Sequence, residues 1–72
     1  MTEAEEARLN ALVERIRRNP RLDPVYWEKE LRKDMAKARP EQRTAFLDNV
    51  ERWVARQEEI LLKKEGAPGS IQ

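Results

Sequence analysis

The chain has 72 residues, of which 40% are charged and 39% are hydrophobic, and a chain of this length forms one small domain at most. It contains no Cys and no His, which excludes disulfides, thiolate metal sites and the commonest general base. The 15 basic and 14 acidic residues leave a formal net charge of +1, so bulk charge does not indicate nucleic acid binding.

A first helix is predicted over residues 3–18. Thr2 and Glu5 have the spacing of a capping box, in which each side chain satisfies the backbone amide of the other residue. Asn19 and Pro20 end the helix. One narrow apolar stripe follows the helical period and consists of Leu9, Leu12, Val13 and Ile16.

A second helix is predicted over residues 24–38. Asp23 is a favourable N-cap, and Pro24 occupies the first helical position, where a missing amide has no cost. Val25 and Tyr26 lie off the apolar face of this helix. That face is formed by Pro24, Trp27, Leu31, Met35 and Ala38.

A third and longer helix is predicted over residues 40–65, with a flexible tail at 67–72. Asp48 and Arg52, and likewise Glu59 and Lys63, are four apart in the order that favours ion pairing within a helix. The apolar face follows the helical period through Phe46, Val50, Trp53, Val54, Gln57, Ile60 and Leu61.

The short connection at Pro40 leaves two arrangements open, a tight hairpin or one long kinked helix. We favour the hairpin, since proline inside a helix costs about 3 kcal/mol and three apolar stripes have to meet. The sequence therefore predicts an all-α fold in a single domain, residues 1–66. This fold is a compact three-helix unit, in which two short helices pack on a long C-terminal helix.

The third helix is longer than its two neighbours and is expected to project beyond them. At 1.5 Å per residue it measures about 37 Å, whereas the first two helices measure about 23 Å each. If they pack beside residues 46–54, the apolar residues near the end of the long helix lack a cover. Uncovered apolar surface is typical of an interaction site.

We therefore expect a non-catalytic protein-protein interaction module that acts as an adaptor, inhibitor or accessory subunit. Its partner is another protein or a second copy of the chain, as in a homodimer. Gln57 is compatible with a register-setting residue in self-association, or with an ordinary position at the edge of the stripe. The predicted interface consists of Trp53, Gln57, Ile60, Leu61 and Leu62.

The two tryptophans also allow two interpretations. Trp27 and Trp53 lie centrally on their stripes, which predicts an indole pair that joins the second and third helices. Alternatively, one of them anchors a partner, because Trp is enriched in binding hot spots and a small core has little room for two indoles.

No catalytic function is expected. The chain has no glycine-rich loop, and its neighbouring carboxylates, such as Glu58 and Glu59, point in different directions among basic residues that keep them ionised. We therefore predict no catalytic residues, cofactor, metal ion or small-molecule substrate.

A basic surface gives the alternative function, a small nucleic-acid-binding helical protein. Lysines recur every four residues along the second helix, and an arginine cluster precedes it. The same row is also compatible with an ordinary solvated face or with an acidic protein partner, because expected Glu30–Lys33 and Asp34–Lys37 contacts dilute its charge. The candidate contacts are Arg15, Arg17, Arg18, Arg21, Tyr26, Lys29, Lys33 and Lys37.

The sequence also predicts a location. No signal peptide or apolar run of spanning length is seen, so we expect a cytoplasmic protein. The polar face of the long helix carries nearly balanced charge rather than the excess of Lys and Arg that is typical of helices lying on membranes. Membrane binding is therefore not expected.

Overall fold

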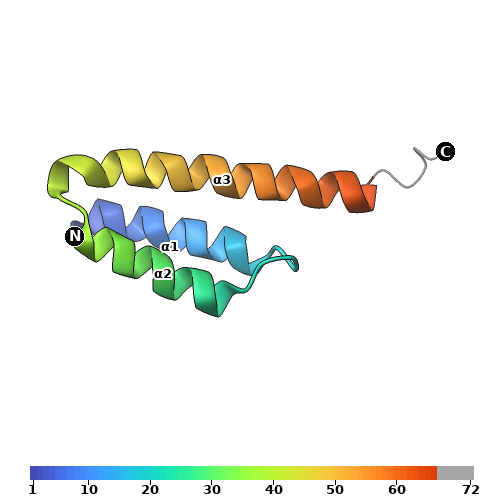
Figure 1. The fold of residues 1–72 in the computed structure, drawn as a ribbon, viewed down its shortest axis with the longest axis horizontal. Coiled ribbons are helices and arrows are strands. Elements are labelled where there is room, and N and C mark those ends of the chain that lie inside the picture. The colour runs from blue at the N-terminus through green and yellow to red at the C-terminus, as the bar shows by residue number, and fades with distance from the viewer. Residues whose placement is uncertain (67–72) are drawn as a thin grey trace.

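The computed structural model describes residues 1–66, with side chains as far as Lys63, and contains three helices in this range (Figure 1). They are α1 (Glu3–Arg17), α2 (Pro24–Lys37) and α3 (Pro40–Gly66). Each predicted boundary is confirmed to within one residue, as expected from capping signals. The predicted flexible tail at 67–72 lies outside the described residues.

The first two helices begin where their capping residues predict. The Glu5 amide donates to Thr2 Oγ1 at 3.1 Å, and the Thr2 amide donates to Glu5 Oε1 at 2.9 Å. This second bond is the largest cause that lowers the pKa of Glu5 below its ordinary value of 4.5. In α2, Asp23 Oδ1 accepts hydrogen bonds from the amides of Val25 and Tyr26.

The loop between α1 and α2 is organised by Asn19, whose residue is only 2% exposed. Its amide donates to the Ile16 carbonyl at 3.0 Å, and its side-chain Oδ1 accepts from the Arg21 amide at 3.0 Å. The Asn19 carbonyl then accepts from the Leu22 amide. These local bonds replace the helical pattern and end α1 at the predicted position.

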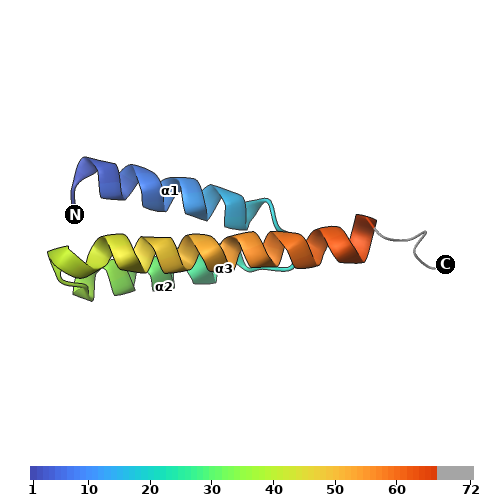
Figure 2. The same cartoon turned by 90° about the horizontal axis from the view of Figure 1, so that it is seen from above.

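The connection at Pro40 is the hairpin rather than the kinked helix. Ala38 has extended backbone angles, φ −72° and ψ 144°, so the helical path is interrupted two residues before Pro40. The chain then turns, and α3 runs back along the first two helices (Figure 1). Seen from above, α2 lies behind α3 while α1 lies to one side of it (Figure 2).

Ion pairs between the helices define their relative directions. Glu5 pairs with Arg43, and Arg15 pairs with Glu58, so α1 and α3 run parallel. Arg32 pairs with Glu6, whereas Glu28 pairs with Arg17, so α2 runs antiparallel to α1. The fold is therefore an up-down-up arrangement of three helices.

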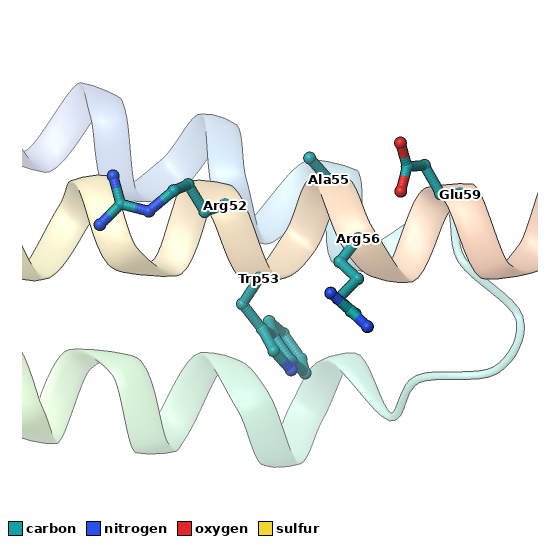
Figure 3. A pocket seen from close by; sticks show the side chains of 5 residues that line it. All are labelled: Arg52, Trp53, Ala55, Arg56 and Glu59. Atoms are coloured by element: carbon teal, nitrogen blue, oxygen red, sulfur yellow. The ribbon is translucent and has the colours of Figure 1, made fainter.

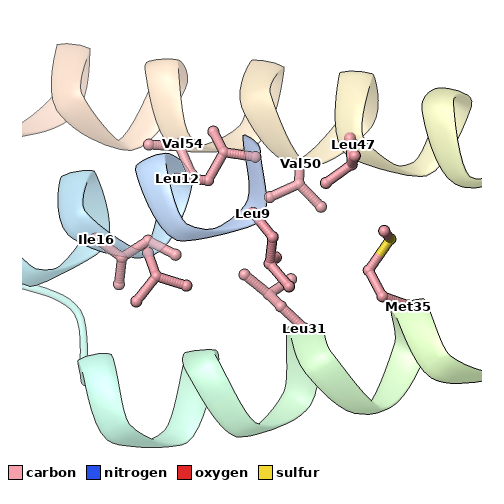
Figure 4. Close-up of a cluster of buried hydrophobic side chains, with 9 residues drawn as sticks. Leu9, Leu12, Ile16, Leu31, Met35, Leu47, Val50 and Val54 are labelled. Carbon is pink, nitrogen blue, oxygen red and sulfur yellow. The ribbon is translucent and has the colours of Figure 1, made fainter. Parts of the chain in front are cut away.

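The core lies between α1 and the other two helices, as Figure 4 shows. All four residues of the predicted α1 stripe are buried, together with Leu31 and Met35 from α2. These side chains close the interior without a disulfide or a metal ion among the described residues. The complete core consists of Leu9, Leu12, Val13, Ile16, Leu31, Met35, Leu47, Val50 and Val54.

One core residue of α3 differs from the prediction. Leu47 was not placed on the apolar face, yet it is 1% exposed, whereas Phe46 is only half-buried at the margin of the core. The reason is that α3 contacts both α1 and α2, so its buried face turns toward α1 by about one position. The apolar face of α3 is therefore wider than a single narrow stripe.

Within residues 1–66, no helix combines the length and apolar character that crossing a bilayer requires.

Leu47→Ala should lower the free energy of unfolding by about 2–5 kcal/mol, because it empties part of a small core. Urea unfolding followed by circular dichroism measures this change. Leu62→Ala is the matched control, since Leu62 is 68% exposed and its truncation should change stability by about 0.5 kcal/mol or less. Equal effects of the two substitutions would contradict the assignment of Leu47 to the core.

Candidate functional site

The three helices meet along three seams, and charged residues close the seam between α1 and α3. Arg8 of α1 bonds to both Asp48 and Glu51 of α3, the latter at 2.9 Å. About two turns further along, Arg15 donates to the Glu58 carboxylate through Nε at 2.9 Å and through Nη2 at 2.6 Å. The bidentate geometry makes this the best-defined of the ion pairs.

The seam between α1 and α2 is closed in the same way. Arg32 donates to Glu6 at 2.9 Å and to the Asn10 side chain, and it also contacts Glu28 on its own helix. Arg17 reaches Glu28 from α1 at 2.9 Å. Each long side of α1 is therefore lined by polar contacts around the apolar core.

The third seam, between α2 and α3, is apolar. Among the side chains of residues 1–63, no ion pair links these two helices. The indoles of Trp27 and Trp53 meet there with ring centroids 4.7 Å apart and planes tilted by 50°. Both rings are half-buried, so the predicted indole pair is confirmed without either ring entering the core completely.

A groove of about 250 Å³ opens along this apolar seam. In Figure 1, α2 diverges from α3 toward the α1–α2 loop. Trp27 belongs to the first turn of α2, which follows that loop, and its ring contacts Trp53. The groove is lined by aromatic and aliphatic side chains from both helices with a single amide among them. These residues are Trp27, Leu31, Phe46, Asn49, Val50 and Trp53.

A second hollow of about 440 Å³ lies on the outer side of α3 and shares Trp53 with the groove. It is lined by Arg52, Trp53, Ala55, Arg56 and Glu59. Figure 3 shows that the Trp53 indole and the Arg56 side chain project from α3 toward α2, whereas Glu59 projects the other way. The apolar groove and a basic rim are therefore continuous across Trp53.

The charges on this rim differ from the prediction. Asp48 was expected to pair with Arg52, but it pairs with Arg8 of α1, and Arg52 donates to the Asn49 side chain instead. The expected pair of Glu59 with Lys63 is also not formed. Competition from α1 for the α3 carboxylates explains the first difference, because helix-surface pairs contribute only about 0.2–0.5 kcal/mol each.

The predicted interface residues lie on more than one side of α3. Trp53, Gln57 and Ile60 share the flank that faces α2, by their spacing of four and three. Leu61 continues the core stripe seven residues beyond Val54, and Leu62 is rotated toward the other flank. The first four are half-buried, whereas Leu62 is 68% exposed.

The projecting end of α3 is present as predicted. In Figure 1 the helix continues beyond the α1–α2 loop, and Ile60 and Leu61 contribute neither to the core nor to the partly buried hydrophobic residues packed against it. Ile60 and Leu61 are thus half-buried outside the core, and Leu62 is exposed.

The predicted basic surface is divided by ion pairs. Arg15 lies in the α1/α3 seam, Arg17 pairs with Glu14 and Glu28, and Lys33 pairs with Glu30 at 3.5 Å as expected. The expected Asp34–Lys37 pair is not formed. The exposed remainder, for which residues 1–63 offer no carboxylate partner, consists of Arg18, Arg21, Lys29 and Lys37, with Tyr26 beside them.

Tyr26 is half exposed and packs edge-on against Trp27, with ring centroids 5.0 Å apart. It therefore belongs to the border of the aromatic groove as much as to the lysine row of α2. The described residues bring together no group of three or more carboxylates that would hold a metal ion.

The groove itself was not predicted, although part of its signal is present in the sequence. Trp27 and Trp53 on facing stripes indicate contact between α2 and α3, but their depth of burial depends on the divergence of the helices. The unpaired state of Arg52 could not be predicted, because Asp48 is four residues from it and the spacing suggests an Asp48–Arg52 pair that the structure does not form.

Comparison of the chain with protein-family models, with curated proteins and with solved structures finds no match.

Glu58→Gln should lower stability at pH 7 by up to about 1 kcal/mol, a small effect because the Glu58 side chain is 37% exposed. The hydrogen bonds from Arg15 lower the pKa of Glu58 below 4.5, so this stability is present above pH 4.5 and is lost as pH falls through the folded-state pKa. Urea unfolding at pH 7 and pH 2.5 measures it.

Glu59→Gln is the control for this prediction, since Glu59 is exposed beside Glu58 and forms no ion pair within residues 1–63. A loss of stability in Glu58→Gln that stays the same at pH 2.5 would show that the Arg15 pair does not cause it.

Proposed function

We propose that the protein is a non-catalytic interaction module that binds another protein through the C-terminal half of α3. The observation that supports this most directly is the exposed position of Leu62, beside Ile60 and Leu61, which contribute nothing to the core. The packing of the three helices does not explain the large aliphatic side chain at position 62, and it covers those of Ile60 and Leu61 only in part. Their burial by a partner would favour binding by roughly 25 cal/mol for each Å² of apolar surface that is covered.

The docking surface extends from the end of α3 toward the middle of the helix. Ile60, Gln57 and Trp53 follow one another along the flank that faces α2, so an apolar strip joins the projecting end to the groove. A half-buried Trp at the centre of such a strip is typical of binding hot spots. A surface of this kind suits an adaptor, an inhibitor or an accessory subunit.

The charged residues favour a protein partner over nucleic acid. Phosphate binding requires a continuous set of available cations, and Arg15, Arg17 and Lys33 are already paired with carboxylates. Lys29 and Lys37, which have no carboxylate partner within residues 1–63, lie on α2, whereas the exposed apolar residue Leu62 lies on α3.

The proposal is tested by capture of partners from a nuclease-treated lysate of the native host, read by mass spectrometry. Leu62→Lys should reduce the recovery of a stoichiometric partner about tenfold or more, because a charge then replaces an apolar contact. Because Leu62 is exposed, this substitution should leave the stability of the fold nearly unchanged. Val25→Lys is the matched control, since Val25 is 74% exposed on α2 and lies outside the proposed surface.

Equal recovery with Leu62→Lys and with the native chain would place the interface elsewhere. Loss of every partner after nuclease treatment would instead favour nucleic acid and the cations of α2.

A further inference from the structure

We infer that the groove between α2 and α3 binds an acidic amphipathic helix of the partner protein. The helix would lie along α3 with its apolar face on Trp27 and Trp53 and with carboxylates on the flank that meets Arg52 and Arg56. This partner class rests on the docking function proposed above and specifies its chemistry. Three features of the groove support it, namely its walls, its lining and its rim.

The walls of the groove are two neighbouring helices, α2 and α3, and no charged side chains bridge them within residues 1–63. The two other seams are bridged by charged side chains from both helices, whereas the α2/α3 seam has no ion pair within residues 1–63. A helix laid over two adjacent helices makes contact with both at the usual interaxial distance of about 8–10 Å. The occupant would thus become the fourth helix of a bundle.

The lining of the groove calls for an apolar occupant. Trp27 and Trp53 leave part of each ring accessible, and Phe46 adds a third aromatic side chain that is only half-buried. Asn49 is the single polar residue among the six that line it. Anchors of this kind fit the i, i+3, i+4 and i+7 side chains of an amphipathic helix.

The rim on the α3 side requires carboxylates. Arg52 and Arg56 are one turn apart, and Lys63 lies two turns beyond Arg56, so the three cations share one row along the helix. Glu59 lies in the same row and forms no ion pair within residues 1–63, so the row carries three cations and one carboxylate, an excess of positive charge. None of the three cations pairs with a carboxylate within residues 1–63, whereas Arg43, the other arginine of α3, pairs with Glu5. Guanidinium groups bind carboxylates with two parallel hydrogen bonds, which gives orientation as well as attraction.

The α2 side of the groove has no comparable excess of charge. Glu30 pairs with Lys33 on the same helix at 3.5 Å, and the exposed Asp34, seven residues beyond Trp27 on the same face, adds a carboxylate that forms no ion pair within residues 1–63. The charge asymmetry therefore lies across the groove, and it specifies which flank of the bound helix carries the acidic residues.

A second copy of the chain is a poorer occupant. If α3 of another molecule docked through the same face, two rows that each carry Arg52, Arg56, Lys63 and only one carboxylate, Glu59, would meet, so repulsive pairs would outnumber attractive ones.

The experiment is a peptide selection with the full chain as bait. In a display library of 18-residue helices, a Leu, Ile and Phe face is fixed and both flanks vary among Glu, Gln and Lys. We expect sequences with Glu on one flank to be enriched. A selected peptide should bind at least tenfold more weakly when its Glu residues are replaced by Lys, measured by fluorescence anisotropy at 0.15 M salt.

The matched bait carries Arg52→Glu and Arg56→Glu, both at exposed positions, and its enriched peptides should carry Lys on the same flank. The control bait carries Arg18→Glu and Lys29→Glu, which change the net charge equally at exposed positions outside the groove. It should retain the preference for Glu. Circular dichroism of the three baits checks that each has the helical content of the native chain.

Enrichment of Lys or of uncharged flanks by the native chain would overturn the acidic helix, as would a preference unchanged by the Arg52 and Arg56 substitutions. Dimerisation of the purified chain that is lost with Asn49→Lys, at an exposed position that lines the groove, would overturn it in favour of a second copy. Each of these results leaves the docking function standing if capture from lysate still depends on Leu62. If capture does not depend on Leu62, the docking function fails independently.

Discussion

The burial of one side of α1 between the other two helices is the interaction on which the fold depends. Four residues of this 15-residue helix enter the core and contact side chains from both α2 and α3. In a chain of 72 residues without cysteine, few other sources of stability are available. The ion pairs on either side of α1 fix the register of its neighbours, while the apolar contacts supply most of the stabilising free energy.

The contact between α2 and α3 therefore differs from the contacts that each of them makes with α1. Each of them is aligned on α1 by charged contacts, but their mutual contact depends on two indoles and a few aliphatic side chains. Because α1 recruits Asp48 and Glu58 of α3, the arginines on the outer side of that helix keep no carboxylate among residues 1–63. The same ion pairs that stabilise the fold thus create the basic rim of the groove.

Most of the fold follows from local sequence signals, whereas the surface depends on tertiary competition. The capping residues Thr2 and Asp23, and the proline at position 40, predict the helix boundaries to within one residue. Leu47 was missed because helical periodicity indicates the centre of an apolar face but not its width when two helices cover it. Asp48 was paired with Arg52 because proximity along one helix is visible in the sequence, whereas the approach of Arg8 from α1 is not. The exposed position of Leu62 was predictable, because the helical period places this residue off the apolar face of α3.

The divergence of α2 from α3 has a mechanical consequence. Both helices are packed on α1, and they contact each other through the rings of Trp27 and Trp53. This contact determines the distance between α2 and α3 near the loop. A change in that spacing rearranges ring packing but separates no pair of opposite charges within residues 1–63. Small adjustments of the groove width therefore avoid the electrostatic cost that the same motion would have at either seam of α1. We therefore expect the spacing between α2 and α3 to adjust more readily than the spacing of either helix from α1.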